Sequence, residues 1–79
     1  MCDKRKQLYH VVSGKYRYNN VWNDIPDKCR YFYAYPGYQR VVLKGVIAEY
    51  RGLTHEACIF VRLSPNTVIE EVKKDAQQN

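Results

Sequence analysis

The chain has 79 residues, 46% of them hydrophobic and 27% charged, and carries a net charge of +5 at pH 7. This length is enough for one compact domain and too short for two, and the hydrophobic fraction is too high for an intrinsically disordered chain. No apolar stretch approaches the roughly 20 residues of a membrane-spanning helix. Eight Tyr stand beside two Phe and one Trp, so most rings carry a hydroxyl group that can face water.

The cysteine and histidine positions bear on redox state and on metals. Cys2, Cys29 and Cys58 form no C-x-x-C pair, and the sequence leads us to expect no signal peptide before them. We therefore expect reduced thiols and a cytoplasmic protein, while a bond between Cys29 and Cys58, or a cross-link between two chains through Cys2, stays open. His10 and His55 lie far from the cysteines in sequence, so we expect no metal site and no cofactor.

The chain begins with a short basic segment. Residues 1–7 carry three consecutive basic side chains at positions 4–6, and we expect them to form a flexible arm. Residues 8–79 then form a single small domain, with strands over about 8–63 and a helix over about 66–77.

Two short strands are predicted before the first clear turn: residues 8–12 and residues 15–18. Asn19 and Asn20 indicate the turn, because asparagine tolerates positive φ. Residues 21–28 hold a proline and two aspartates and are predicted to be a loop, which Trp22 and Ile25 would attach to the core.

Three longer strands are predicted in the middle of the chain: residues 29–35, 40–51 and 56–63. Pro36 and Gly37 end the first of them, and Gly45 marks a bulge or bend in the second. We expect the three strands to form an antiparallel meander.

A helix is predicted over residues 66–77. Thr67 and Glu70 have the spacing of a capping box. The apolar stripe of this helix comprises Val68, Ile69, Val72 and Ala76. A helix this short is marginal alone, so we expect it to dock on the sheet.

Together these elements predict a mainly β protein of the α+β class. It would be a small antiparallel sheet, or a partly open barrel of about four or five strands, with one C-terminal helix. The order of short strands followed by a docked helix resembles small SH3-like barrels in architecture. This resemblance rests on no shared motif and implies no residue role and no activity.

The alternation of side chains predicts which faces are core. In residues 56–63 the predicted core side chains are Ala57, Ile59, Val61 and Leu63. In residues 29–35 one face carries Tyr31, Tyr33 and Tyr35, and the other carries Arg30, Phe32 and Ala34. Either the tyrosines belong to the core, or they form an exposed platform for a ligand while Phe32 and Ala34 are buried.

Positive charge and tyrosine occur in the same part of the chain. Residues 1–51 hold ten Lys and Arg against four Asp and Glu, whereas residues 52–79 hold three against four. Interleaved cations and rings suit a nucleic-acid surface, because cations neutralise phosphates and rings stack on bases. The predicted binding residues are Lys15, Arg17, Lys28, Arg30, Tyr31, Tyr33, Tyr35, Tyr38 and Arg40. We therefore expect a small basic protein that binds DNA or RNA.

Two other classes of function use the same residues. Tyrosine and arginine are common at protein interfaces, so a small adaptor or inhibitor of an intracellular protein machine is the alternative, with an acidic protein surface or a second copy as partner. A metal-free ribonuclease would need general acid–base groups, for which His55 in a turn is the one candidate. Nothing fixes a nucleophile or an orienting partner, so we expect a protein that is not an enzyme.

Overall fold

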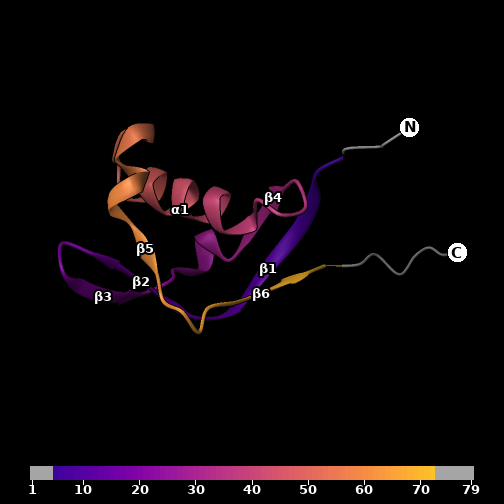
Figure 1. Ribbon diagram of the computed structural model, residues 1–79, viewed down its shortest axis with the longest axis horizontal. Helices are drawn as coiled ribbons and strands as arrows, with labels where there is room; N and C mark the ends of the chain where they lie inside the picture. Colours follow the sequence, from indigo (N-terminus) through magenta and orange to yellow (C-terminus); the bar gives the residue numbers. More distant parts are fainter. Residues whose placement is uncertain (1–4, 73–79) are drawn as a thin grey trace, which may run out of the picture.

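The computed structural model describes residues 5–72 and shows a small α+β protein with two three-stranded antiparallel sheets and one α-helix (Figure 1). The first sheet has the order β4–β1–β6, with bounds Tyr31–Ala34, Gln7–Ser13 and Val68–Glu71. The second has the order β3–β2–β5, with bounds Val21–Asp24, Lys15–Tyr18 and Arg62–Leu63. Helix α1 spans Gln39–Tyr50, and two 3₁₀ helices, η1 and η2, span Asp27–Cys29 and His55–Phe60.

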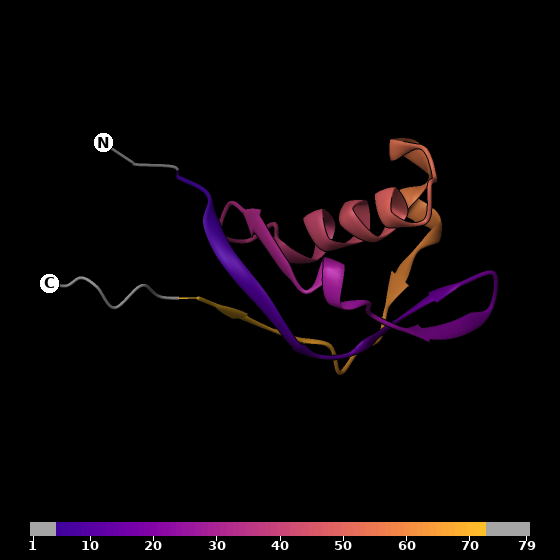
Figure 2. The same ribbon diagram turned by 180° about the vertical axis from the view of Figure 1, so that it is seen from behind.

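Helix α1 lies on one side of the two sheets, as opposite views show (Figure 1 and Figure 2). It packs against β4 and η1 in one half of the molecule and against β5 and η2 in the other. Over residues 5–72 the sheets do not close into a barrel, so the predicted SH3-like barrel of about four or five strands is not confirmed, whereas antiparallel pairing is. The predicted meander is wrong, because β4 and β5 lie in different sheets. No helix in this part of the chain is long and apolar enough to cross a membrane.

The hydrophobic core lies between α1 and the inner faces of the sheets. Leu43 and Ile47, one turn apart on α1, are fully buried. They share one buried cluster with Phe32 of β4 and Val11 of β1, and Tyr16 of β2 extends the cluster into the second sheet. The two sheets are therefore held together by a common core under a single helix.

Gly14 lies between β1 and β2, where the chain passes from one sheet to the other. The buried side chains of β1 are Tyr9 and Val11, whereas that of β2 is Tyr16, so the inward parity reverses between them. Gly14 has a φ of +141°, and a Cβ atom there would lie 2.5 Å from Oγ1 of Thr67. Only glycine permits this close approach, and the reversal keeps the core on one side of both strands.

The strand predicted over residues 40–51 is wrong, because this segment is α1. Its Val and Ile residues favour a strand by propensity, but Leu43 and Ile47 have the i, i+4 spacing of one helix face. Val42 and Val46, with the same spacing, pack beside that face. An apolar run of this length is also longer than a typical buried strand.

Gly52 ends α1. It has a φ of +76°, the left-handed conformation that glycine adopts without strain. The Gly52 N–H donates to the Glu49 carbonyl at 3.0 Å and the Leu53 N–H donates to the Ala48 carbonyl at 2.8 Å. These two bonds form a Schellman motif, so a glycine after a long apolar run is the sequence signal that indicates this helix.

The helix predicted over residues 66–77 is wrong where the structure describes it. Strand β6 lies there and pairs antiparallel with β1, and residues 73–77 lie outside the described residues. The adjacent β-branched residues of β6 favour a strand, and pairing with a distant strand outweighs the local capping pattern. The Thr67 hydroxyl, expected as the cap, instead lies 2.7 Å from the Ser64 hydroxyl in the preceding turn.

Only the end of the strand predicted over residues 56–63 forms, as the two-residue β5. The preceding residues belong to η2, in which alternate side chains do not share a face. Of the four predicted core side chains, Val61 is fully buried, but Ile59 is 69% exposed. The prediction of the core is therefore wrong for Ile59, and its neighbour Phe60 is 65% exposed as well.

More of the elements predicted in the first half of the chain are confirmed. The strands predicted at 8–12 and 15–18 are confirmed as β1 and β2, and β4 lies within the strand predicted at 29–35. The turn at Asn19 and Asn20 is confirmed, with φ of 55° and 63°. The N-terminal arm predicted over 1–7 lies largely outside the described residues, and β1 begins at Gln7.

The loop predicted over residues 21–28 is wrong in its first half. Residues 21–24 form β3, because the two-residue turn before them returns the chain antiparallel to β2. Ile25 is buried as predicted. Trp22 is not part of the core, since 47% of it is exposed.

Candidate nucleic-acid interface

Tyr31 and Tyr33 face away from the core on β4. Each is 58% exposed, whereas Phe32 and Ala34 are buried. This alternation follows from the period of two along a strand, and Phe32 belongs to the core cluster that includes residues of α1. Of the two arrangements that the sequence leaves open, the structure has these two tyrosines outside.

Strand β1 contributes neighbours to the same outer face. The His10 ring stacks on Tyr31, with centroids 4.5 Å apart and an angle of 19° between the planes. Leu8 lies opposite Tyr33 in the register of β1 and β4. We call Leu8, His10, Tyr31 and Tyr33 the aromatic face. Glu70 of β6 lies opposite His10 on its other side, so the strand that borders this face brings negative charge.

Tyr35 and Tyr38 lie at the two ends of the turn that follows β4. The Tyr38 N–H donates to the Tyr35 carbonyl at 3.0 Å, and Gly37 has a φ of +94°, as the third position of a type II turn requires. Both tyrosines are exposed. The Lys6 ammonium lies 5.8 Å from the centroid of the Tyr35 ring, within the range of a cation–π contact.

Two of the predicted phosphate contacts, Lys15 and Arg30, lie beside carboxylates. The Lys15 ammonium is 3.0 Å from Oδ1 of Asp24. The Arg30 Nε donates to a backbone carbonyl at 3.3 Å and lies 3.6 Å from Oδ1 of Asp27. Lys28 is exposed on η1. Both ion pairs are exposed and therefore weak, but each carboxylate lowers the positive potential at its partner.

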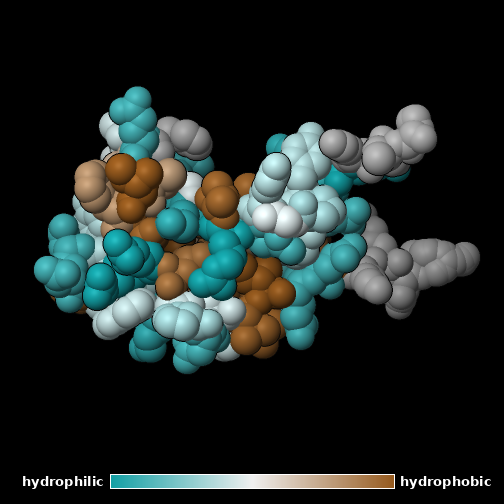
Figure 3. All heavy atoms as spheres, viewed as in Figure 1, coloured by the Kyte–Doolittle hydropathy of each residue, from teal (hydrophilic) through white to brown (hydrophobic). Residues whose placement is uncertain are grey.

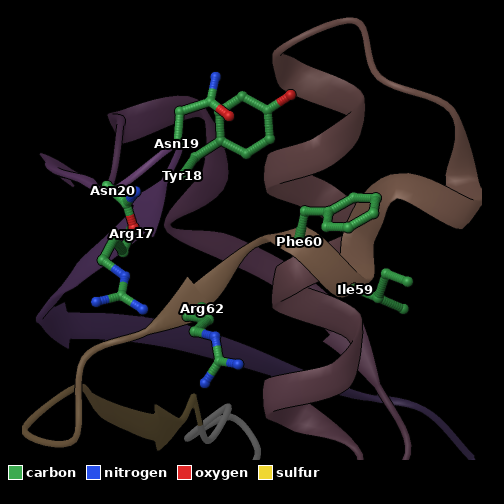
Figure 4. Close-up of a pocket in the computed structure, with 7 residues that line it drawn as sticks. All are labelled: Arg17, Tyr18, Asn19, Asn20, Ile59, Phe60 and Arg62. Atoms are coloured by element: carbon green, nitrogen blue, oxygen red, sulfur yellow. The ribbon is translucent and has the colours of Figure 1, made fainter.

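The outer face of the second sheet carries a row of three side chains. Arg17 of β2 lies opposite Trp22 of β3 on one side and opposite Arg62 of β5 on the other. The Arg17 guanidinium lies 5.6 Å from the centroid of the Trp22 ring. Figure 4 shows Arg17 and Arg62 extending to the same side of the sheet, so the register of three strands brings two guanidinium groups beside an exposed indole.

Helix α1 adds two more cations beside Arg62. Arg40 and Lys44, at i and i+4, lie on one side of the helix and line a hollow of about 250 Å³ with Arg62. The Arg40 Nη2 donates to the Ser64 carbonyl at 3.1 Å, which holds the start of α1 against the end of β5. We call Arg17, Arg40, Lys44 and Arg62 the basic cluster.

The basic cluster is not neutralised by any carboxylate that the structure describes. Among residues 5–72, no carboxylate lies within ion-pair distance of any of its four side chains. Like charges held together raise the local positive potential and attract anions. Arg17 and Arg40 were predicted as phosphate contacts, whereas Lys44 and Arg62 were not. Lys44 was assigned to a strand where the structure has α1, and the alternation in residues 56–63 did not indicate that Arg62 pairs with Arg17.

Apolar side chains border the cluster. Figure 3 shows hydrophobic side chains at the surface near η2, next to the hydrophilic hairpin of β2 and β3. Ile59 and Phe60 of η2 line a cavity together with Arg17 and Arg62 (Figure 4). Rings and cations are thus brought together here by residues distant in sequence.

The thiols do not contribute to this surface. Cys29 and Cys58 are both free, so the bond between them that the sequence leaves open is absent, and Cys2 lies outside the described residues. Burial raises the pKa of the Cys29 thiol, which keeps it protonated and unreactive at neutral pH. Within residues 5–72 no three His, Cys, Asp or Glu side chains gather as a metal site would require.

Comparison with known proteins adds no relative. The chain matches no protein-family model, no curated protein and no solved structure. The chemistry of its surface is therefore the basis on which a function is proposed.

Proposed function

We propose that the chain is a small nucleic-acid-binding protein whose basic cluster contacts the phosphates of a single strand of DNA or RNA. The observation that carries this proposal is the convergence of Arg17, Arg40, Lys44 and Arg62 from three elements with no described carboxylate beside them. Arginine suits this role, because its planar guanidinium can bind phosphate oxygens in pairs.

A single strand fits this surface better than a duplex does. Trp22 and Phe60 are exposed next to the cluster, and exposed rings stack on unpaired bases.

The aromatic face extends this surface for a longer strand. Strands β1 and β2 are joined at Gly14, and their outward side chains include His10 on the first sheet and Arg17 on the second. A nucleic-acid strand that continues from the basic cluster along β2 and β1 reaches Tyr31 and Tyr33, whose rings are available for stacking. The predicted tyrosine contacts thus keep a role that is secondary to the cluster.

The protein is proposed to act in the cytoplasm and to bind without cleaving the strand. The free thiols of Cys29 and Cys58 support a reducing compartment. Incubation with RNA in the presence of a chelator should leave the RNA intact, and cleavage that His55→Ala abolishes would contradict binding alone.

The proposal is tested by the affinity for a labelled single-stranded decamer at several salt concentrations. Four phosphate contacts predict a slope of log K against log salt of about −3, since each contact with a single strand contributes about −0.7. A flat salt response, or no binding at low salt, contradicts the proposal. An acidic protein partner would show a similar salt response, but its capture would survive nuclease treatment.

A protein partner is the second candidate, and the exposure of the aromatic face favours it. Tyr31, Tyr33 and the neighbouring Val12 are exposed on a sheet face that no described element covers, and such patches often mark interfaces. The partner would be a second copy of this chain. Sedimentation equilibrium should then show a dimer that Tyr33→Ala dissociates, and a monomer at all concentrations would exclude it.

A further inference from the structure

The cavity beside the basic cluster has the dimensions of a small-ligand site. It has a volume of about 490 Å³ and lies between the tip of the β2–β3 hairpin and η2 (Figure 4). Binding sites for small molecules commonly fall between about 300 and 1,000 Å³. Its lining combines two guanidinium groups, two rings and two side-chain amides, contributed by Arg17, Arg62, Tyr18, Phe60, Asn19 and Asn20.

The two guanidinium groups form the anionic end of the site. Arg17 and Arg62 lie opposite each other in the register of β2 and β5, and both belong to the basic cluster. The Trp22 ring beneath Arg17 restrains that side chain. Two neighbouring guanidinium groups with no described carboxylate partner can share the oxygens of one phosphate.

The rings of Tyr18 and Phe60 lie away from the two guanidinium groups, along the opposite part of the cavity (Figure 4). Phe60 is 65% exposed, which leaves an apolar ring surface in contact with water. Tyr18 is held by Arg51, whose guanidinium lies 4.9 Å from the Tyr18 centroid. Aromatic rings at this position can stack on a base whose phosphate is bound by the arginines.

The hairpin tip supplies groups that can read the edge of that base. Asn19 and Asn20 both have positive φ, as a type I′ turn requires, and glycine would satisfy this backbone equally well. Their side-chain amides make no hydrogen bond within residues 5–72. An asparagine amide can donate and accept in a pair, and the N6 donor and N7 acceptor of adenine are the pair that asparagine binds in DNA complexes.

We propose that this cavity is a subsite for one adenine nucleotide, with its phosphate at Arg17 and Arg62 and its base between Tyr18 and Phe60. This inference rests on the proposed function and adds a base preference to it. The same chemistry is offered by a nucleotide within a strand and by a free nucleoside monophosphate.

The test compares A, C and U decamers of RNA by the quenching of Trp22, which is the only tryptophan of the chain. The wild-type protein should bind the A decamer about tenfold more tightly than the other two, as one good amide–base pair allows. In the double variant Asn19→Gly, Asn20→Gly the turn is retained, and the preference should fall below twofold while the salt slope stays unchanged. Phe60→Ala should weaken all three decamers about tenfold through lost stacking, and Tyr50→Ala, an exposed ring outside the cavity, should have no effect.

Equal binding of the three decamers by the wild-type protein, or a preference that survives the double variant, overturns the subsite. Either result leaves the proposed function standing if salt-dependent binding persists, so the two failures are distinguishable. Adenosine monophosphate should displace the A decamer more effectively than cytidine monophosphate does. Free adenosine monophosphate that binds as tightly as the decamer would support the same subsite and identify a free nucleotide as its ligand.

Discussion

The two three-stranded sheets present different chemistry on the faces that α1 does not cover. The β4–β1–β6 sheet exposes the aromatic face and is bordered by Glu70, whereas the β3–β2–β5 sheet exposes Arg17 and Arg62, with the Trp22 indole beside Arg17 on β3. Tyr31 and Tyr33 thus lie on one sheet, whereas Arg17 and Arg62 lie on the other. The four cations of the basic cluster come together where α1, β2 and β5 meet, and not beside Tyr31 and Tyr33.

Substitutions on the two sides of β4 should differ most in stability. Phe32→Ala removes a core ring and should lower the free energy of unfolding by about 3–5 kcal/mol, which approaches the whole stability of a domain this small. Tyr33→Ala on the outer side should cost less than about 1 kcal/mol, the value of a cross-strand pair. Urea denaturation measures both, with Phe32→Leu as a milder core variant. Equal losses at Phe32 and Tyr33 would mean that the two faces are not distinct.

The joint between the sheets should also be sensitive to substitution. Gly14→Ala places a methyl group against Thr67 and should cost about 1–3 kcal/mol from overpacking, in addition to its backbone strain. Gly37→Ala is the matched control, because Gly37 also has positive φ but has no atom within 4 Å of the added Cβ position. Thermal unfolding should show a clearly larger loss for Gly14→Ala. A loss no larger than that of Gly37→Ala would contradict the close approach at the joint.

The aromatic face should matter only for long ligands. The double variant Tyr31→Ala, Tyr33→Ala should weaken binding of a 20-nucleotide strand about 30-fold or more, since two stacked bases at about 1–3 kcal/mol each sum to at least about 2 kcal/mol. A pentanucleotide that occupies only the basic cluster should bind the variant and the wild-type protein equally. A loss of affinity that is the same for both lengths would place the tyrosines in the same contact as the arginines.

The two thiols should differ in reactivity. Cys29 is buried and its pKa is raised, so less thiolate forms at any pH, and it should react more slowly with iodoacetamide than the partly exposed Cys58. Alkylation rates followed by mass spectrometry between pH 7 and 9, in a Cys2→Ser background, measure the difference. Faster reaction at Cys29 would contradict its position under α1.

The sequence predicted those parts of the fold in which local pattern and tertiary packing agree. Alternation in residues 15–18 and the two asparagines after them predict β2 and its turn correctly, because a tight hairpin is specified by adjacent residues. The parity of residues 31–34 stayed open, since Tyr and Phe are both acceptable in a core. The position of α1 decides which side chains of β4 are buried, and the segment that forms α1 was predicted to be a strand.

The errors occur where distant residues decide. β-branched residues of α1 favour a strand locally, yet Leu43 and Ile47 bury a helical face against β4 and β1. Residues 68–71 fit the spacing of a helix, but they complete a sheet with β1. The basic cluster also depends on contacts between distant residues, because Lys44 and Arg40 share one face of a helix and Arg62 lies beside Arg17 only through the pairing of β5 with β2. The alternation of side chains along one β-strand therefore does not predict the basic cluster.

The salt dependence of binding in two charge-matched variants tests the central claim most directly. Arg17→Gln, Arg62→Gln removes two positive charges from the basic cluster, and Lys15→Gln, Lys28→Gln removes two from elsewhere on the surface. The account predicts that the first variant reduces the slope of log K against log salt by about 1.4, two contacts at about 0.7 each, while the second leaves the slope near its wild-type value. Equal slopes in the two variants would show that the affinity depends on the net charge of the protein and not on the basic cluster.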